Sequence, residues 1–394
     1  MPVSTIVVGG GIGGLSLARE LSRAGLSVVV LERAAKLTTV GAGIIMNPNA
    51  MAVLEANGLA ACVRARSAPY LARDTYDHRG RRLATRDYRP LYAEGRLAIG
   101  ALCHRAHLHE CLFDGLPAGT VHLDTRIASL HAGTDGVRVE TESGQTFSGD
   151  VLIGADGIHS TVRTQLFGLS EPVYLGYRSH RFVVANRDGL EHFTEFLGRG
   201  QRIGLVPIGS GQLYVWTTFN SPRESRAWAL DSVETLSSLF GEFTDPRVRH
   251  AFAGLESTDG VVCTDIEEVH QAAWARGPVA LLGDAAHALT PNMGQGAGMA
   301  MEDAAVLAEE LSRVARQEAE VPTALDAYVA RRRRRVDTIV RLSRQIGEEG
   351  QLTGALTCWL RNRRIGREGR SAERTRAALE RLLAWPPRPE GTPG

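Results

Sequence analysis

The first thirty or so residues constrain the fold more than any other stretch of the chain. An apolar, β-branched run at 6–8 is followed at once by a glycine-rich turn at 9–14 and a helix-like segment at 15–24. A second apolar run, 28–31, ends in Glu32. The order strand, glycine turn, helix, strand and acid predicts a βαβ unit with parallel strands, and therefore an α/β fold.

The turn has the spacing G-x-G-x-x-G at Gly9, Gly11 and Gly14. Such glycines allow a tight turn, close approach of a pyrophosphate to the backbone, and close packing of helix on strand. The helix N-terminus favours an anion, and Glu32 follows at about the distance at which an acid holds a ribose diol. The alternative is a loop with only a structural role. The flanking strand and helix and the acid together favour a dinucleotide site, without choosing NAD or FAD.

The composition is globular, and the length suggests two or three domains: 394 residues, 43% hydrophobic and 23% charged. A formal net charge of +1 provides no overall field for nucleic acid or a membrane surface. Lys36 is the only lysine among 45 basic residues, so arginine clusters are weak evidence of binding. Even the five consecutive arginines 331–335 would point all round a helix, so no nucleic-acid partner is expected.

Compartment and membrane association are predicted from cysteines and apolar runs. The five cysteines form no C-x-x-C pair and are expected to be reduced thiols in the cytosol. The first apolar run enters the glycine turn within five residues, so no signal peptide is expected. No stretch of 18 uncharged apolar residues occurs. A cytoplasmic protein without a membrane partner is therefore expected.

Periodicity beyond Glu32 predicts two kinds of region. The first mixes a loop (38–45), helices (51–59, 103–116), strands (121–123, 127–130, 151–153) and a hairpin (136–147). Polar strand-like segments at 70–97 and strands from 174 to 265 predict a largely antiparallel sheet, with one helix pair at 233–243 and 246–255. A strand at 279–282 and long helices at 298–315 and 322–347 follow. Leu379, Leu382 and Leu383 are expected to dock a C-terminal helix, and the Pro/Gly-rich tail beyond Pro386 is expected to be disordered.

Two further motifs stand at predicted strand ends, where α/β sheets bind ligands. Asp156-Gly157 precedes a helix, and helix capping by Asp156 or Ser160 is an equally good interpretation. Asp284 ends another strand, and Gly294, Gly296 and Gly298 then open a helix where a flat ligand can lie against the backbone. His287 between them has no second residue at metal-ligand spacing, so it is expected to be packed, and no metal is expected.

In this order, G-x-G-x-x-G, D-G and G-D-A-A-H-x-x-x-P-x-x-G-Q-G resemble the motifs of single-component (class A) FAD-dependent aromatic hydroxylases, or flavin monooxygenases. The resemblance covers roughly residues 4–350, and 283–303 look closest to the salicylate, 3-hydroxybenzoate and urate hydroxylase and zeaxanthin epoxidase branches. It implies a Rossmann-like FAD-binding domain with an inserted, largely antiparallel β-sheet substrate domain and C-terminal helices. The expected boundaries are 1–72, 100–173 and 266–345 for FAD, 73–99 and 174–265 for substrate, and 346–394 for the C-terminal helices and tail.

The resemblance also implies the reaction. NADH or NADPH reduces the flavin, O2 adds to give a C4a-hydroperoxyflavin, and one oxygen atom enters an aromatic or other electron-rich small molecule while the other leaves as water. The protein has to orient the substrate and keep water out. The implied class is an FAD-dependent NAD(P)H monooxygenase, a hydroxylase; another flavin oxidoreductase on the same fold, such as an epoxidase, oxidase or reductase, is the alternative.

Residue roles carry over from the matching positions. Asp284 would bind the ribityl chain, Arg105 would reach FAD, and Asp156 would couple FAD and NAD(P)H binding. Backbone N–H groups at 294–298 would face the flavin carbonyl that becomes anionic on reduction. The full expected FAD set is Gly9, Gly11, Ile12, Gly13, Gly14, Glu32, Arg33, Ile45, Arg105, Ile127, Asp156, Asp284, Gly294, Gln295, Gly296, Ala297 and Gly298.

The substrate is expected between the sheet domain and the loop at Pro291. Arg202 lies in a segment that resembles one facing the flavin in the urate-type branch, and with Pro291 it is the catalytic candidate. A solvated strand arginine is the alternative for Arg202. Where the family often has Trp-Arg-Gly, this chain has His180-Arg181-Phe182. Substrate candidates are His180, Arg181, Tyr214, Trp216, Asn292 and Met293.

The sequence also leaves alternative functions open. A halogenase would be expected to carry W-x-W-x-I-P, which the segment at 216–218 does not match. An NAD-binding dehydrogenase using Glu32 would leave Asp284 and the loop at Gly294 unexplained. A third alternative is a non-catalytic binding protein with the flavin-binding fold. Flavin absorbance at ~450 nm would separate the flavoproteins from the dehydrogenase.

Overall fold

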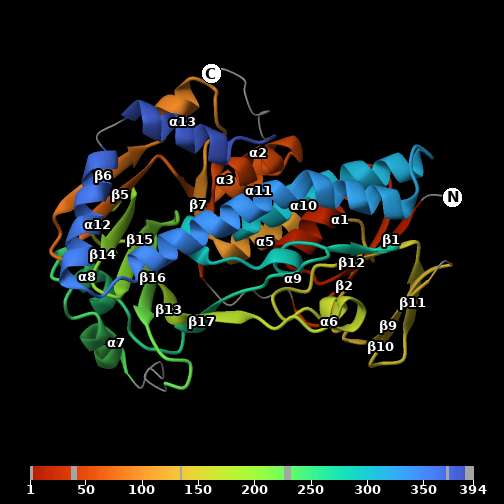
Figure 1. The fold of residues 1–394 in the computed structure, drawn as a ribbon, viewed down its shortest axis with the longest axis horizontal. Helices are drawn as coiled ribbons and strands as arrows, with labels where there is room; N and C mark the ends of the chain where they lie inside the picture. Colours follow the sequence, from red (N-terminus) through yellow and green to blue (C-terminus); the bar gives the residue numbers. More distant parts are fainter. Residues whose placement is uncertain (1–2, 37–41, 134, 226–231, 370–371, 387–394) are drawn as a thin grey trace. The chain divides into compact units, whose positions relative to one another are not determined.

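The chain forms two compact units, each assembled from three stretches of sequence (Figure 1). The computed structural model describes residues 3–36, 42–133, 135–225, 232–369 and 372–386. Unit 1 comprises Met1–Thr38, His109–Val173 and Glu267–Arg344; unit 2 comprises Thr39–Leu108, Tyr174–Ile266 and Gln345–Gly394. The domain boundaries expected from the sequence assign each segment to FAD binding or to substrate binding. This assignment stays a prediction.

Unit 1 is built on a six-stranded sheet in the order β18-β19-β12-β1-β2-β8. Strands β19, β12, β1, β2 and β8 run parallel, and β18 closes one edge antiparallel. The predicted parallel sheet is therefore confirmed. The strands are β1 (Ser4–Val8), β2 (Ser27–Leu31), β8 (Val121–His122), β12 (Val151–Gly154), β18 (Ala275–Arg276) and β19 (Val279–Leu281).

This strand order brings the motif loops to one edge of the sheet. The carboxyl ends of parallel neighbours meet at the same edge, and β19, β12, β1 and β2 are consecutive neighbours. Backbone hydrogen bonds join the loops: Gly9 N–H donates to the Leu31 carbonyl and Ala155 N–H to the Val8 carbonyl, both at 2.8 Å. Loops from distant parts of the chain, such as those at Val8 and Ala155, are thus adjacent.

The long helices of unit 1 pack through small residues. A Cβ on Gly13, in the first turn of α1 (Ile12–Arg23), would lie 2.5 Å from Leu282 Cδ2 and 3.2 Å from Ala300 Cβ in α10. The first turns of α1 and α10 are therefore in contact. Figure 1 shows α10 and α11 running side by side, as two long helices predicted from the sequence. The remaining elements are α6 (Thr161–Phe167), α9 (Asp284–His287), η1 (Pro291–Met293), α10 (Gly296–Ala315), α11 (Val321–Gly350) and the antiparallel β9 (Ile127–Gly133), β10 (Gly136–Thr141) and β11 (Thr146–Gly149).

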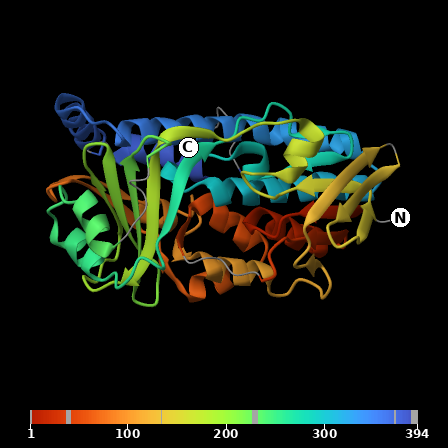
Figure 2. The same cartoon turned by 90° about the horizontal axis from the view of Figure 1, so that it is seen from below.

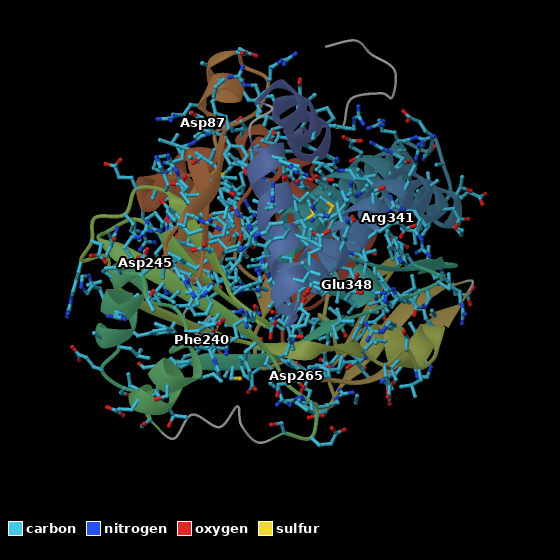
Figure 3. All side chains as sticks on the ribbon, turned by 60° about the vertical axis from the view of Figure 1, so that its left-hand side comes forward. Asp87, Phe240, Asp245, Asp265, Arg341 and Glu348 are labelled. Atoms are coloured by element: carbon cyan, nitrogen blue, oxygen red, sulfur yellow. The ribbon has the colours of Figure 1, made fainter. Side chains whose placement is uncertain are left out.

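Unit 2 contains the predicted, largely antiparallel sheet, in the order β17-β13-β16-β15-β14-β5-β6. Strands β14 and β5 of this sheet pair in parallel, and β13, β16, β15 and β14 pair in sequence as antiparallel neighbours. One face packs through Phe182, Phe196 and Ile203 against α7 and α8, the predicted helix pair, shown in green beside the sheet in Figure 2. Phe240 and Asp245, labelled in Figure 3, belong to this helical layer. The bounds are β5 (Ala72–Asp77), β6 (Arg82–Asp87), β13 (Val173–Ala185), β14 (Phe193–Leu197), β15 (Gln201–Pro207), β16 (Gln212–Asn220), β17 (Val262–Glu268), α7 (Val233–Leu239) and α8 (Pro246–Ala253).

Three local predictions in unit 2 are wrong. Cys103 and His104 belong to the buried strand β7 and not to a helix, because a short apolar run fits either structure. Residues 43–46 form strand β3 beside β7 and not a loop. The strand-like stretch at 70–97 contains helix α4, which Pro90 helps to begin. The other elements are β3 (Gly43–Met46), β4 (Ser67–Pro69), β7 (Ala101–His104), α2 (Pro48–Ala56), α3 (Ala60–Ala65), α4 (Arg89–Ala93), α5 (Arg105–Phe113), α12 (Ala355–Glu368) and α13 (Ala372–Leu383).

The C-terminal helix packs as the sequence predicts, but two of the five cysteines do not carry the expected free thiols. Leu379, Leu382 and Leu383 of α13 pack in a cluster around Tyr70, as expected. The tail beyond Pro386 lies outside the described residues. Cys103, Cys263 and Cys358 carry free thiols, but Cys62 and Cys111 are disulfide-bonded, so the expectation of reduced thiols is wrong for these two. Spacing alone cannot predict such a bond.

Among the described residues, no helix combines the length and apolar character needed to span a bilayer.

Candidate functional site

Of the three glycines that define the G-x-G-x-x-G spacing after β1, two are crowded and one is open. Gly9 has φ +108°, and a Cβ on it would lie 2.4 Å from the Ala155 carbonyl oxygen. A Cβ on Gly14 would lie 2.0 Å from the Gly9 carbonyl oxygen. A Cβ on Gly11, the N-cap of α1, would meet no atom within 4 Å. The turn therefore leaves space over the N-terminus of α1, which fits a bound pyrophosphate.

Glu32 and His109 brace this turn from two sides. The Glu32 carboxylate accepts hydrogen bonds from the Gly10 N–H at 2.6 Å and the Ala34 N–H at 2.8 Å. The His109 ring nitrogen Nε2 is bonded to the Gly10 carbonyl at 2.8 Å. The acid expected to hold a ribose thus also orders the loop, and Arg33 beside it is exposed. His109 was missed because no local pattern connects it to a turn 99 positions earlier.

Asp156, in the D-G motif after β12, caps helix α6. Its carboxylate accepts from the Thr161 N–H at 2.6 Å and the Ser160 hydroxyl at 2.5 Å, while Ser160 accepts from the Arg163 N–H at 2.9 Å. Burial raises the pKa of Asp156 above its usual value, against the lowering effect of these donors. The capping interpretation is confirmed for both side chains; a role of Asp156 in cofactor coupling stays a prediction.

Arg163, which the sequence did not single out, ties this motif to the next one. It is buried, and its guanidinium donates to the Ala285 carbonyl at 2.9 Å and the Ile158 carbonyl at 2.6 Å. Ala285 stands in the G-D-A-A-H segment. A single side chain therefore fixes the relative positions of two motif loops.

Asp284 begins α9 at the end of β19 and has an exposed carboxylate with no partner among the described residues. The neighbouring Gly283 has φ +61°, and its N–H donates to Asp303 at 3.1 Å. Asp303, on α10, also bonds His287 Nε2 at 2.6 Å. Asp303 thus holds the loop from the buried side and leaves the Asp284 carboxylate open for a ligand.

His287 is packed, as predicted. Its ring is buried, 4.9 Å from the Trp274 ring, and its Nε2 is committed to Asp303. Asp303 in turn accepts from Arg332 Nε at 2.7 Å. Arg332 reaches Glu302 at 2.6 Å, and Arg335 bonds the same carboxylate at 2.6 Å. A buried network of charges therefore lies directly behind the G-D-A-A-H segment.

The network predicts acid sensitivity. Burial alone would raise the pKa of Asp303, but His287 and Arg332 lower it to about 2, from an ordinary 3.8. A carboxyl whose folded-state pKa is depressed stabilises the fold above its unfolded pKa and loses that stabilisation as pH falls. We expect its contribution to fall by about 1 kcal/mol between about pH 5 and about pH 3. Urea unfolding of the wild type and of Asp303→Asn at both pH values checks this. An equal pH effect in the two proteins would contradict it.

The loop between α9 and α10 is anchored to helix α11. The Thr290 and Ser343 hydroxyls are 2.7 Å apart, and the Asn292 amide donates to the Ser343 carbonyl at 2.9 Å. Pro291 and Met293 lie on either side of Asn292 in the short helix η1. The side chain of Asn292, expected to contact substrate, is thus used in holding the loop.

The loop ends in an open helix N-terminus. Gly294 is left-handed with φ +61°, Gln295 is the buried N-cap of the 20-residue helix α10, and a Cβ on Gly296 would meet nothing within 4 Å. Ala297 and Gly298 continue the first turn. Unit 1 therefore presents two adjacent helix N-termini, α1 and α10, each with space for a group of negative charge. Of the remaining FAD candidates, Ile127 begins β9 in unit 1, and Ile45 and Arg105 belong to β3 and α5 in unit 2.

In unit 2 the candidates divide between the two faces of the sheet. Pairing places Arg181 opposite Trp216 and Trp216 opposite Gly204. Arg202 is two residues from Gly204 on β15, and Tyr214 is two residues from Trp216 on β16. Both side chains therefore point to the same face of the sheet as Arg181 and Trp216. His180 lies on the other face, fully buried, with its ring stacked 4.9 Å from Phe219. The structure therefore brings four of the five candidates together and separates His180 from them.

Glycines let two aromatic rings of this face pack closely against backbone: Trp216 against Gly204 of β15, and Tyr214 against Gly43 of β3, which belongs to another sheet. A Cβ on Gly204 would be 2.1 Å from Trp216 Nε1, and a Cβ on Gly43 would be 2.3 Å from Tyr214 Cγ. Burial raises the pKa of Tyr214, so its hydroxyl is neutral at ordinary pH. The two rings form an aromatic platform, which we define as Tyr214 and Trp216.

Arg202 is a buried partner of Glu195 and not a solvated strand arginine. Its Nη2 lies 2.5 Å from Glu195 Oε1, and Arg73 bonds the other oxygen. Burial alone would raise the pKa of Glu195, but the two arginines lower it to about 2. The Arg202 guanidinium is 5.2 Å from the centre of the Trp216 ring. Arg202 therefore supports the aromatic platform from beside it.

Comparisons with known proteins identify the family. Residues 2–343 match the FAD binding domain family model. The chain is 36% identical to the aurachin C monooxygenase/isomerase of Stigmatella aurantiaca, over 98% of this chain and 99% of that protein. It is 32% identical to the 2-heptyl-3-hydroxy-4(1H)-quinolone synthase of Pseudomonas aeruginosa, over 91% and 93%. The fold is similar to that of Klebsiella pneumoniae HpxO complexed with FAD and uric acid, with TM-score 0.85, 27% identity, and 97% and 96% coverage.

These matches confirm the resemblance inferred from the motifs and exclude the dehydrogenase rival. FAD is the cofactor, with NADH or NADPH as the reductant, and relatives of the chain include hydroxylases of aromatic small molecules. The open N-termini of α1 and α10 and the free Asp284 carboxylate are compatible with that cofactor. The chain belongs to the single-component, class A FAD-dependent monooxygenases.

Proposed function

We propose that this enzyme uses NADH or NADPH and O2 to insert one oxygen atom into a bicyclic nitrogen heteroaromatic, with alkyl-substituted 4-quinolones as the substrate class to test first. The relatives that match over nearly the whole chain include one whose name specifies such a ring, the 2-heptyl-3-hydroxy-4(1H)-quinolone synthase. The observation that carries the proposal is the aromatic platform of unit 2.

The platform suits a flat, mostly apolar ring. Tyr214 and Trp216 lie in a cluster with Phe193 and Val206, so a ring placed there meets aromatic and aliphatic surface. Arg181 is a second arginine on the same face, opposite Trp216 in register, and supplies a donor for a ring carbonyl or phenolate oxygen. We assign Arg202 a positioning role through Trp216, since its charge is already balanced by Glu195.

The cofactor site is assigned to unit 1. The N–H groups at the start of α1 would hold the pyrophosphate, Glu32 the adenosine ribose and Asp284 the ribityl chain. The N–H groups of 294–298 would stabilise negative charge on the flavin ring. Bound FAD supplies hydride acceptance and oxygen activation, and the protein contributes orientation and exclusion of water. Pro291 and Met293, in the anchored loop before α10, are assigned to the substrate side of the flavin.

Two glycine variants separate cofactor binding from folding. Gly11→Ala places a methyl group where the chain leaves open space, so we expect FAD affinity to fall at least about tenfold while stability changes by about 0.5 kcal/mol or less. Gly14→Ala drives a Cβ against the Gly9 carbonyl, so we expect a loss of about 1–3 kcal/mol in stability as well. Flavin titration of the apoprotein and urea unfolding measure the two effects. Unchanged FAD affinity in Gly11→Ala would contradict the assigned pyrophosphate position.

Substrate-stimulated turnover tests the proposed reaction. The purified flavoprotein is screened for NADH and NADPH oxidation with 4-quinolones of differing alkyl length, urate, hydroxybenzoates and a polyene. We expect a quinolone to stimulate oxidation and to give a product heavier by one oxygen atom. Stimulated oxidation that yields only hydrogen peroxide would indicate an effector, and an oxygenated polyene would favour the epoxidase alternative. A protein that retains no flavin with added FAD would contradict the whole assignment.

A further inference from the structure

Helix α12 of unit 2 exposes three large apolar side chains on one face. Leu356, Trp359 and Leu360 are 67%, 49% and 52% exposed. Their spacing of three and four residues puts them side by side on the helix surface. Cys358 and Arg361, on the opposite face, are buried. Single exposed apolar residues are common on protein surfaces, but a contiguous group of this kind marks an interaction surface.

Two arginines lie on the same face of α12, closer to its C-terminus. Arg363 and Arg367 follow Leu356 by seven and eleven residues, so they extend the stripe by two and three helical turns. The Arg363 guanidinium lies 4.7 Å from the centre of the Trp359 ring. In the part of the chain that the structure describes, neither arginine has a carboxylate partner. Arg364, beside the stripe, is by contrast paired with Glu349 and Glu368.

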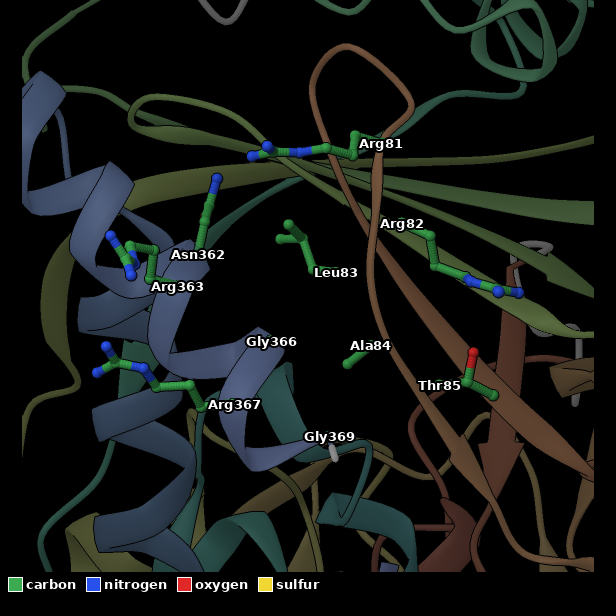
Figure 4. Close-up of a pocket in the computed structure, with 10 residues that line it drawn as sticks. All are labelled: Arg81, Arg82, Leu83, Ala84, Thr85, Asn362, Arg363, Gly366, Arg367 and Gly369. Atoms are coloured by element: carbon green, nitrogen blue, oxygen red, sulfur yellow. The ribbon is translucent and has the colours of Figure 1, made fainter. Parts of the chain in front are cut away.

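A hollow of about 500 Å³ beside this stripe adds more positive charge. It lies between α12 and β6, and Figure 4 shows Arg81 reaching from the hairpin toward Asn362. Arg363 and Arg367 project outward from the helix in the same view, away from the hairpin. Its lining contains four arginines and no acidic residue: Arg81, Arg82, Leu83, Ala84, Thr85, Asn362, Arg363, Gly366, Arg367 and Gly369.

We propose that the exposed face of α12 docks on an anionic lipid bilayer. Leu356, Trp359 and Leu360 enter the headgroup region, and Arg82, Arg363 and Arg367 bind lipid phosphates. Helices that lie in a membrane interface combine leucine and tryptophan with arginine in this way, and tryptophan prefers the boundary between water and hydrocarbon. The near-zero net charge of the whole chain does not oppose this, because screening confines the interaction to charges close to the lipid.

A second copy of the chain fits this face less well than a lipid surface. In a two-fold symmetric pair the same patch meets itself, so the arginines of one copy would find no carboxylate in the patch of the other. Three apolar side chains also fall short of the roughly 800 Å² that each partner buries in a stable interface. An anionic bilayer complements both the apolar residues and the cations. If the substrate carries an alkyl chain, as the proposed function has it, docking places the enzyme where such a molecule partitions; the docking itself does not depend on that function.

Vesicle sedimentation with the FAD-loaded full-length protein tests the proposal. We expect the protein to pellet with vesicles of phosphatidylglycerol and phosphatidylcholine, not with phosphatidylcholine alone, and less at high salt. Trp359→Ser combined with Leu360→Ser should weaken binding at least about tenfold. Arg363→Gln and Arg367→Gln should each cost about fivefold. Matched controls are Leu169→Ser, at an exposed leucine of unit 1, and Arg249→Gln, at an exposed arginine of α8; both should bind like the wild type.

Three results would overturn the proposal. One is absence of binding to anionic vesicles at low salt, and another is equal binding by the Trp359→Ser/Leu360→Ser variant. The third is self-association in solution that these two substitutions abolish without any vesicle binding, which would make the face an interface between copies. Flavin content and thermal midpoint of each variant verify that it is folded.

Discussion

Replacing Arg332 with alanine is expected to lower the free energy of unfolding by about 3–5 kcal/mol, more than any other single arginine substitution in the run 331–335. Arg332 is buried and bonds Asp303 at 2.7 Å and Glu302 at 2.6 Å. The substitution leaves His287 as the remaining side-chain partner of Asp303 among the described residues and removes the cation between two buried carboxylates. Loss of a cation that two buried carboxylates share leaves much of their desolvation cost uncompensated. Urea unfolding measures the loss.

Arg331 provides the matched control, since it stands next to Arg332 on the same helix but is 44% exposed. Its partner Glu309 is exposed, and its other partner Glu310 is buried but keeps Arg313, so Arg331→Ala should cost about 1 kcal/mol or less. We also expect Arg332→Ala to weaken FAD binding, because Asp303 holds the Gly283 N–H beside Asp284. Equal stabilities of the two variants would contradict the assigned importance of the buried network.

The sheet of unit 1 and its motif loops could be predicted because their signals are local. A strand, a glycine turn and a helix follow one another within 25 residues, and the carboxyl-edge rule then places Glu32, Asp156 and Asp284 at one edge. The open Gly11 and crowded Gly14 also agree with the roles that the motif spacing assigns. No tertiary information is needed for these inferences.

The side chains that hold the motif loops could not be predicted, since their partners are distant in the chain. His109 reaches the Gly10 carbonyl across 99 positions, and Arg163 reaches the Ala285 carbonyl across 122. The run 331–335 was correctly expected to point all round its helix, but the sequence did not reveal which arginine is buried. The available signal is the pair of adjacent acids Glu302 and Asp303, which stands between the apolar stretches 299–301 and 304–308 of α10.

The face on which each substrate candidate of unit 2 lies could not be predicted for a similar reason. His180 and Arg181 are neighbours and were both expected at the substrate, but adjacent strand residues point to opposite faces. Which of the two faces the helices α7 and α8 depends on pairing register, which the sequence of one strand does not contain. The stacking of His180 on Phe219 resolves it.

Gly204→Ala is expected to reduce kcat/KM for the substrate about 100-fold while FAD binding stays within about twofold of wild type. The new Cβ would stand 2.1 Å from Trp216 Nε1, so the indole has to leave its place on the sheet. Displacement of about 1 Å at a substrate-positioning group has effects of this size. Steady-state kinetics with the substrate identified by the screen, together with flavin titration, measure both quantities. Gly260→Ala is the control within unit 2, because a Cβ there meets nothing within 4 Å.

A double-substitution cycle separates loss of the platform from general damage to the sheet. If Gly204→Ala acts only by moving the indole, adding it to Trp216→Ala should cost almost nothing further, so the two effects will be strongly non-additive. Damage to the sheet would instead add to the Trp216→Ala effect and would lower stability in both backgrounds. Full turnover by Trp216→Ala would remove Trp216 from the substrate site. It would leave the FAD assignment intact, because every group assigned to the pyrophosphate, ribose and ribityl chain lies in unit 1.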